Sequence, residues 1–367
     1  MPKNIKVILY DESEKNNNIV SKFLNLKGPK LFSFKNEDEL TARINILKNQ
    51  YTSKEVIVLN PFKGRFFQIC PGSPNVICCN YRVINTCFNC FYDCTYCFLN
   101  TYLNSFGVFQ FTNLEDLHKE IDLFINGVSP DLVYRIGSGE FTDSLMMDEI
   151  TGIGESLIEK FSTYKNIMLE LKTKSGNVDH LLGIKDKGST VLAWSLNTER
   201  NIAKYEGGSA SLKKRIDAAK KACEAGFFLA FHFDPIIIYD GWEEDYTTVI
   251  SNLFSNINAD KVVWISLGCF RYAPGFKNIM QEKFPEEELT LEEMFPGVDG
   301  KYRYLKNKRI NIYKTIKGYL NTYTKKPFIY LCMETGNVWH SVFNNYYESS
   351  ESLEKDFSKY LKNTFLK

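Results

Sequence analysis

The chain of 367 residues has neither a long apolar run nor an appreciable net charge. Its 45 lysines and arginines balance 44 aspartates and glutamates, so any nucleic-acid site has to be a local patch. No uncharged apolar run approaches the roughly 18 residues that a membrane helix requires, and the apolar stretch Ile5 to Tyr10 is short for a signal peptide. Repeats and low-complexity tracts are also missing. The sequence therefore predicts a cytoplasmic protein with no membrane partner, built as one large domain or two.

Cysteine is the residue type that stands out against this background. The chain has 10 cysteines, and clustered thiols in a reducing compartment indicate metal or redox chemistry rather than disulfides. Seven of the ten lie between Cys70 and Cys97. The other three, Cys223, Cys269 and Cys332, are scattered, and each by itself is more often a small buried hydrophobic residue than a reactive thiol.

The hydrophobic pattern alternates between short strands and helices. Residues 1–69 form an N-terminal α/β extension with strands near 5–10 and 55–59, residues 70–275 hold six strand-and-helix units, and residues 276–367 form a C-terminal α/β addition. This alternation predicts an α/β protein with a parallel sheet, either open and doubly wound or closed into a partial (β/α)6 barrel. The six strands are expected near Tyr81 to Asn85, Leu132 to Ile136, Ile167 to Leu171, Val191 to Leu196, Phe227 to Phe233 and Val262 to Leu267.

Polar residues follow nearly every one of these strands. The cysteine loop follows the first, Glu140 the second, Lys174 the third, and Ser195 and Asn197 the fourth. In β/α barrels the active site lies at the carboxyl ends of the strands, so this placement favours the partial barrel. The alternative for each residue alone is an ordinary loop start or helix cap.

The strongest motif is the CxxxCxxC of Cys90, Cys94 and Cys97 in the stretch CFNCFYDCTYCF. Three thiolates on one loop can each bind one iron of a [4Fe-4S] cluster and leave the fourth iron open to a small chelating molecule. The spacing resembles that of the radical S-adenosylmethionine (SAM) superfamily. That resemblance implies a reduced cluster that cleaves SAM to a 5′-deoxyadenosyl radical.

Further cysteines leave alternatives open for this loop. Cys87 extends the run to CxxCxxxCxxC, which can also make a zinc site or a closed cluster with four protein ligands. Cys70, Cys78 and Cys79 in CPGSPNVICC are either packed thiols or, together with Cys87, ligands of a second metal centre.

Several residues after the strands fit a SAM site. The GSGE of Gly137 to Glu140, including Ser138, resembles the GGE motif with which the superfamily holds the SAM amino group, although a tight strand-to-helix turn explains it equally. Lys174 is suited to the SAM carboxylate, and Ser195 and Asn197 to its ribose or carboxylate; the alternative for each is a solvated loop residue. Phe98 is placed to pack on the adenine or within the core.

Seven segments extend the resemblance from superfamily to family. In order, they cover roughly Cys70 to Trp339 and resemble spore photoproduct lyases and the lyase-like proteins often called DNA repair photolyases. The segments are CFNCFYDCTYCFLN (Cys87 to Asn100), RIGSGEFTDSL (Arg135 to Leu145), LKTKS (Leu171 to Ser175), WSLNTE (Trp194 to Glu199), RIDAAKKACEAGF (Arg215 to Phe227), DPIIIYDGWEEDY (Asp234 to Tyr246) and YLCMETGNVW (Tyr330 to Trp339).

The family resemblance implies a lyase that reverses thymine photodimers of the spore-photoproduct type in damaged DNA, with a cysteine returning a hydrogen atom and a tyrosine pair helping to regenerate SAM. Tyr96 matches one tyrosine of the pair, but Phe98 stands in place of the second, and Glu140 in place of the donor cysteine. A carboxylate cannot give up a hydrogen atom as a thiol does. Cys269 is therefore the first expected substitute donor and Cys332 the second. The resemblance also implies an electron donor such as flavodoxin or ferredoxin.

A basic and tyrosine-rich segment gives the DNA expectation a physical basis. Residues 301–326 carry nine lysines and arginines and no acidic residue, and interleaved tyrosines can stack on bases while the cations neutralise phosphates. Asp299 and Gly300 predict a tight hairpin turn between Phe295 and Tyr304 that could wedge into a duplex. A solvated helix face is the alternative. The expected DNA contacts are Tyr302, Arg303, Tyr304, Lys306, Lys308 and Arg309.

Two rival functions stay open at this point. One is a radical SAM enzyme of the same family acting on another substrate, such as a peptide or a modified nucleoside, which Glu140 and Phe98 favour. The other is a non-catalytic zinc or iron-sulfur module that binds DNA.

Overall fold

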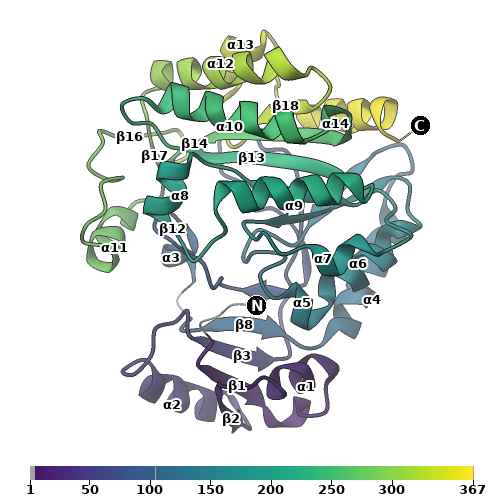
Figure 1. Ribbon diagram of the computed structural model, residues 1–367, viewed down its shortest axis with the longest axis vertical. Coiled ribbons are helices and arrows are strands. Elements are labelled where there is room, and N and C mark those ends of the chain that lie inside the picture. Colours follow the sequence, from purple (N-terminus) through teal and green to yellow (C-terminus); the bar gives the residue numbers. More distant parts are fainter. Residues whose placement is uncertain (1–4, 104, 367) are drawn as a thin grey trace.

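The computed structural model describes residues 5–103 and 105–366, whose strands form two main sheets (Figure 1). A five-stranded sheet of mainly N-terminal residues lies at one end of the long axis, and an eight-stranded sheet with its helices occupies the rest. Among the described residues, no helix combines the length and the apolar character that crossing a bilayer requires.

The five-stranded sheet has the order β2-β1-β3-β8-β6, with only β6 antiparallel to its neighbour. Residues of β3 alternate between its faces, because Ile57 packs with α1 (Asn18–Leu24) and Val58 with α2 (Glu37–Leu47). The strands expected near 5–10 and 55–59 are confirmed, whereas β8 lies outside the expected set. The strands are β1 (Val7–Asp11), β2 (Lys30–Phe34), β3 (Val56–Asn60), β6 (Cys87–Phe88) and β8 (Val108–Phe111).

The eight-stranded sheet curls into a half-barrel with the order β18-β14-β13-β11-β10-β9-β5-β4. All six expected strands are present and pair in parallel, which confirms the predicted partial barrel. They are β5 (Arg82–Ile84), β9 (Tyr134–Gly137), β10 (Ile167–Thr173), β11 (Val191–Ser195), β13 (Phe228–Ile236) and β14 (Val262–Cys269). Two further strands complete the sheet: β18 (Phe328–Leu331), parallel to β14, and β4 (Phe67–Ile69), antiparallel to β5.

Helices pack along the half-barrel and close its core. Figure 1 shows α9 (Leu212–Glu224), α10 (Trp242–Asn256) and α12 (Lys306–Tyr323) side by side over the strands. Ile312 and Ile316 of α12 are fully buried, so the amphipathic helix expected in the basic segment is confirmed. The other helices are α3 (Leu99–Tyr102), α4 (Leu114–Gly127), α5 (Asp148–Thr151), α6 (Ile153–Ser162), α7 (Asp179–Leu182), α8 (Glu199–Tyr205), α11 (Phe276–Lys283), α13 (Gly336–Phe343) and α14 (Ser350–Thr364).

Short antiparallel pairings connect the loops around one end of the half-barrel. β16 (Phe295–Pro296) and β17 (Tyr302–Arg303) form the expected hairpin, with Gly300 at the positive φ of +77° that such a turn requires. β15 (Arg271–Tyr272) pairs with β17. β7 (Asp93–Cys94), within the cysteine loop, pairs with β12 (Glu206–Gly207).

Candidate functional site

Side chains from the ends of five strands, β9, β10, β13, β14 and β18, meet at the carboxyl mouth of the half-barrel. Lys172 Nζ, on β10, lies 4.0 Å from Glu140 Oε2 in the loop after β9. Arg271, just beyond β14, donates to both carboxylate oxygens of Asp234 at 3.0 and 3.1 Å. Its Nη2 also lies 3.3 Å from the Sγ of Cys332, which follows β18. The mouth that the sequence predicted therefore collects acids, bases and a thiol.

Charged groups in this mouth hold one another in the ionised form. Burial opposes the charge of Lys172, but nearby carboxylates, Glu140 first among them, raise its pKa above the ordinary value. Burial likewise opposes ionisation of Asp234, yet Arg271 lowers the pKa of that carboxyl. The mouth is thus ionic at neutral pH.

The cysteine loop runs between β6 and α3 and brings three free thiols together. Cys90 and Cys94 are buried and Cys97 is partly exposed. Lys54 donates to the carbonyl of Cys90 at 2.7 Å. Burial raises the pKa of each thiol, and the positive charges of Lys54 and Lys174 oppose that rise at Cys97. Three unbonded thiols on one turn beside lysines fit the donor set of a cluster whose thiolates each bind a different iron.

Cys87 is separate from these three. Its Sγ faces the carbonyls of Phe88 and Asn89 at 3.7 and 3.9 Å, and burial raises its pKa to about 12. Among the described residues, no three Cys, His, Asp or Glu side chains converge as ligands of one metal ion. A zinc ion needs its donors around a single point, so the zinc alternative has no geometric support here.

The remaining cysteines of the loop-rich segment lie near the mouth instead of near Cys87. Ile77 N donates to Glu334 O at 2.8 Å, which sets this segment against the chain after β18. Burial and the charge of Asp234 raise the pKa of the Cys332 thiol, and Cys79 and Cys78 make smaller contributions to the same rise. These two cysteines are therefore neighbours of Cys332. Of the two alternatives left open for Cys70, Cys78, Cys79 and Cys87, packed thiols or ligands of a second metal centre, the described residues favour packed thiols, because no three ligand side chains converge there on one metal ion.

The GSGE turn is shaped by packing against β10. A Cβ on Gly139 would lie 2.9 Å from Lys172 Cβ, so a side chain there would force the two strands apart. Ser138 is buried and its Oγ bonds Ser144 Oγ at 3.0 Å. Glu140 alone of this turn presents a charged side chain to the mouth.

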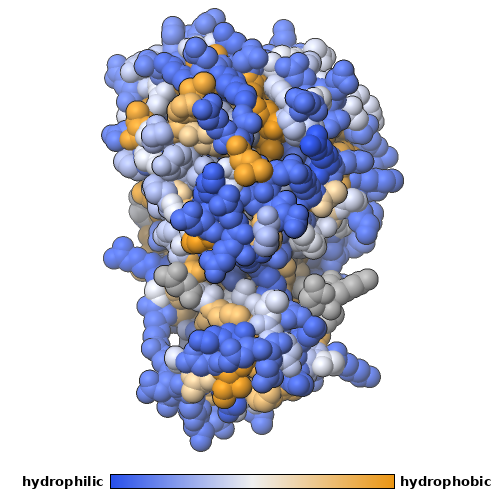
Figure 2. Space-filling model, turned by 90° about the vertical axis from the view of Figure 1, so that its left-hand side faces the viewer, coloured by the Kyte–Doolittle hydropathy of each residue, from blue (hydrophilic) through white to orange (hydrophobic). Residues whose placement is uncertain are grey.

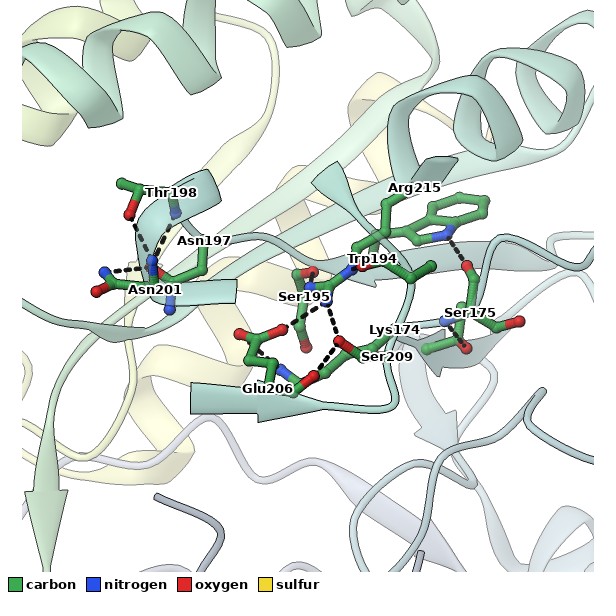
Figure 3. A network of polar contacts seen from close by, with 12 residues as sticks. Lys174, Ser175, Trp194, Ser195, Asn197, Thr198, Asn201, Glu206, Ser209 and Arg215 are labelled. Atoms are coloured by element: carbon green, nitrogen blue, oxygen red, sulfur yellow. Dashed lines mark hydrogen bonds and ion pairs between the residues drawn. The ribbon is translucent and has the colours of Figure 1, made fainter. Parts of the chain in front are cut away.

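Lys174 belongs to a polar network that includes Glu206, Ser209 and Arg215 (Figure 3). Its Nζ donates to the Tyr96 hydroxyl at 3.1 Å and lies 3.6 Å from the Glu206 carboxylate. Tyr96 in turn donates to Glu206, which is ion-paired with Arg215 at 2.5 Å. Sequence reasoning missed Glu206; Arg215 begins one of the family-like segments, which was a usable signal.

Ser195 and Asn197 differ in what they offer a ligand. Ser195 is half-buried, and its carbonyl accepts from Arg215 at 2.9 Å (Figure 3). Asn197 is almost fully buried: its Oδ1 accepts from Tyr246 at 2.7 Å and from Asn201 at 2.8 Å, and its Nδ2 donates to a carbonyl. Its bonds are already used within the fold, so the expectation that Asn197 binds SAM is corrected to a structural joint between β11 and β13.

Phe98 has an exposed ring beside Cys97. The residue is 44% exposed, and its ring centroid lies 6.0 Å from that of Tyr102 and 6.3 Å from that of Phe141. A flat ligand could stack there.

The two expected hydrogen donors lie in different surroundings. Cys269 is buried behind the mouth, where its backbone N–H donates to the Tyr313 hydroxyl at 3.0 Å and Glu334 and Arg309 are neighbours. Cys332 lies in the mouth beside Arg271. The sequence expectation placed Cys269 before Cys332 as donor; of the two, Cys332 is the thiol that lies among the charged groups of the mouth.

The expected DNA contacts divide into buried and exposed groups. Arg303 is buried in an ion pair with Asp299 at 2.5 Å, Tyr304 is buried, and Arg309 pairs with Glu334 at 2.8 Å. These three are corrected to core contacts. The helical spacing that buries Ile312 also turns Arg309 inward, whereas Arg303 and Tyr304 are buried at and directly after β17, before the helix begins. The exposed group consists of Lys306, Lys308 and the partly exposed Tyr302.

A half-barrel with a CxxxCxxC loop at its carboxyl mouth is the arrangement of the radical SAM enzymes. The family model described as "Spore photoproduct lyase" matches residues 77–331. A spore photoproduct lyase of Bacillus subtilis is 29% identical over 244 residues, 64% of this chain and 71% of the relative, and one of Clostridium acetobutylicum is 24% identical over 286 residues, 76% and 83%. The chain belongs to the spore photoproduct lyase family and is an enzyme, a radical SAM lyase.

Solved structures agree on the fold. The structure described as "Spore photoproduct lyase complexed with dinucleoside spore photoproduct" is 22% identical, covers 90% of this chain and 100% of that chain, and superposes with a TM-score of 0.75. A mutant of a spore photoproduct lyase with bound AdoMet and dinucleoside spore photoproduct gives 0.76 at 22% identity and the same coverage.

Proposed function

We propose that this enzyme repairs spore photoproduct in DNA by cleaving the carbon-carbon bond that joins the two thymines, with SAM and a [4Fe-4S] cluster as cofactors. The observation that carries the proposal is the CxxxCxxC loop held at the mouth of the half-barrel, together with family membership over residues 77–331. The solved relatives with bound AdoMet and dinucleoside spore photoproduct support this choice of cofactor and substrate. We place the reaction in the cytoplasm, with a flavodoxin or ferredoxin as electron donor.

The residues proposed to bind the cluster and SAM are those that lie in the cysteine loop and at the carboxyl ends of the neighbouring strands. Cys90, Cys94 and Cys97 hold the cluster, which when bound and reduced supplies the electron that cleaves SAM to a 5′-deoxyadenosyl radical. Lys174 contacts the Tyr96 hydroxyl of this loop at 3.1 Å, and its charge suits the SAM carboxylate. The half-buried Ser195 offers a hydroxyl, Ser138 and Glu140 offer the turn expected at the amino group, and Phe98 offers a ring face for adenine.

Cys332 is the proposed hydrogen donor. Burial and Asp234 raise its pKa, so the side chain keeps the S–H bond that the reaction needs. The thymine radical left after cleavage takes this hydrogen atom, which forms the product C–H bond and leaves a thiyl radical on sulfur. Tyr96 is the proposed phenol through which the thiyl radical regains a hydrogen atom from 5′-deoxyadenosine, because Phe98 has no hydroxyl.

Damaged DNA is the proposed partner, and the hairpin is the proposed contact. Val298 at its tip is 60% exposed. The exposed Lys306 and Lys308 lie at the start of α12, shortly after β17, and Lys308 also pairs with Glu292 at 2.6 Å. An apolar tip beside lysines suits entry between bases with contact to phosphates.

The test is an anaerobic assay on protein reconstituted with iron and sulfide and reduced in the presence of SAM and dinucleoside spore photoproduct. Release of thymidine monomers together with 5′-deoxyadenosine is the expected result. Formation of 5′-deoxyadenosine without thymidine would remove this substrate and favour the second candidate, the same cofactor chemistry on a peptide or modified nucleoside. The ionic pair Glu140–Lys172, in place of a thiol, is the observation that favours that candidate. Zinc without iron in the purified protein would contradict both.

A further inference from the structure

Glu206 is a buried carboxylate that three side chains share. Its side chain is 1% exposed, and it accepts from the Tyr96 hydroxyl, pairs with Arg215 at 2.5 Å and lies 3.6 Å from Lys174 Nζ. Arg215 is itself fully buried and spends its remaining donors on backbone carbonyls at 2.9 Å and on Ser209 at 2.7 Å. Burial opposes the charge of Glu206, but Lys174 and Arg215 lower the pKa of its carboxyl, so Glu206 is an ionised group held away from solvent. Figure 3 shows its contact with Arg215.

The backbone of Glu206 is also hydrogen-bonded to the cysteine loop through the pairing of β12 with β7. β12 pairs with β7 so that Glu206 lies opposite Cys94, and Thr95 N donates to Tyr205 O at 2.9 Å. On the other side, Ala210 N donates to Lys174 O at 3.0 Å. The segment around Glu206 thus joins the loop that carries the thiols to the end of β10 that carries Lys174.

We propose that Glu206 is a positioning residue of the cofactor site, which fixes Tyr96 and Lys174 against the cysteine loop and lowers the reduction potential of the cluster through its charge. This rests on the proposed function only in requiring that the loop hold the cluster. A buried negative charge opposes the addition of an electron nearby, and low local dielectric preserves the effect. The lysine and arginine offset part of that charge but remain when the carboxylate is neutralised.

The experiment is a redox titration of the reconstituted wild-type protein and of Glu206→Gln, without SAM, followed by the EPR signal of the reduced cluster. Glu206→Gln keeps the side-chain shape and removes the charge. We expect the reduction equilibrium to shift toward the reduced form by about tenfold, which is about 59 mV for a one-electron couple. Glu206→Asp, which retains the charge, should return the potential toward that of the wild type.

Asp93→Asn is the matched control, because Asp93 lies on the same short strand but its side chain is 43% exposed and pairs with Lys283 at 3.2 Å. Solvent screens that charge, so its loss should leave the potential in place. Lys174→Met removes a positive charge and should lower the reduction potential, the opposite of the rise expected for Glu206→Gln. This variant tests the electrostatic effect if Glu206→Gln does not fold. An unshifted reduction potential in Glu206→Gln, or equal shifts in Glu206→Gln and Asp93→Asn, would overturn the inference about Glu206. Neither result would contradict the proposed repair function. A wild-type protein that takes up no iron overturns the proposed function instead.

Discussion

Arg271 holds a thiol and a carboxylate at once, and this arrangement separates Cys332 from the other cysteines of the chain. Two of its nitrogens are fixed by Asp234, and one also lies against Cys332 Sγ. Cys269 is only a few residues away from Arg271 in sequence but faces Tyr313 on the other side of β14. At the scale of single residues, it is this position in the mouth that distinguishes Cys332 from Cys269 and underlies its proposed role as hydrogen donor.

Replacing Cys332 by alanine should uncouple the two halves of the reaction. We expect repair to fall by at least about tenfold while 5′-deoxyadenosine formation continues, because only the hydrogen return is lost. The measurement is the ratio of thymidine to 5′-deoxyadenosine in the anaerobic assay. Cys269→Ala is the control and should keep the wild-type ratio; a drop there with an unchanged Cys332→Ala would reverse the assignment.

Arg309 is held in the core by an ion pair with Glu334. Its guanidinium is nearly buried and bonds both oxygens of Glu334 at 2.8 and 3.2 Å. Arg309→Ala leaves that carboxylate buried without its partner and should cost about 3–5 kcal/mol of unfolding free energy. Urea denaturation is the measurement, with the exposed Lys306→Ala expected within about 0.5 kcal/mol of the wild type. Equal stability of the two variants would contradict the burial argument.

Neighbouring strands of the half-barrel are also tied together by side chains in its interior. Glu170 of β10 accepts from His232 of β13 at 2.7 Å and from Trp264 of β14 at 3.0 Å. Burial opposes ionisation, but the charge and hydrogen bond of His232 outweigh it and lower the pKa of Glu170 to about 2. At the scale of elements, one carboxylate links three strands.

This carboxylate predicts a loss of stability in acid. A group whose pKa falls on folding stabilises the fold above its ordinary pKa of 4.5, and that contribution disappears as the pH falls from 4.5 toward about 2. The loss should be at most about 3 kcal/mol. Urea denaturation of the cluster-free protein between pH 6 and pH 3, with Glu170→Gln as the variant, measures it. The variant should be less stable at pH 6 but flatter across this window, and parallel curves would contradict the assignment.

In the folded protein, several lysines of the basic segment 301–326 have acidic or carbonyl partners, so the segment does not present a continuous positive surface. Lys308 pairs with Glu292, Lys326 with Asp260, and Lys317 bonds the Val342 carbonyl. The face shown in Figure 2 is mainly hydrophilic, with apolar residues in small separate patches. In the part of the chain that the structure describes, the exposed lysines of the segment without an ion-pair partner are Lys306, Lys314 and Lys325.

Because the salt dependence of DNA binding scales with the number of phosphates that lysines and arginines contact, the three unpaired lysines of this segment predict that duplex binding depends only weakly on salt. Three phosphate contacts give a slope of about −3 for log K against log salt, and Lys306→Ala should reduce its magnitude by about 0.9. Fluorescence anisotropy with undamaged duplex across salt concentrations is the measurement. Lys213→Ala, on the distant α9, is the control and should leave the slope unchanged. A much steeper slope would mean that another surface binds the DNA.

Local pattern alone determined much of this protein. The six strands follow from hydrophobic runs of matching length, the hairpin from the Asp299–Gly300 turn, and the three-thiol loop from covalent spacing, because each depends on residues that are neighbours in the chain. Tertiary structure decided the rest. Tyr96 and Glu206 are 110 positions apart, and Arg271 and Cys332 are 61 apart, so no local spacing could show that they meet. Burial of Tyr304 and Arg309, and the choice between Cys269 and Cys332, likewise depend on which face of a strand or helix the folded core covers.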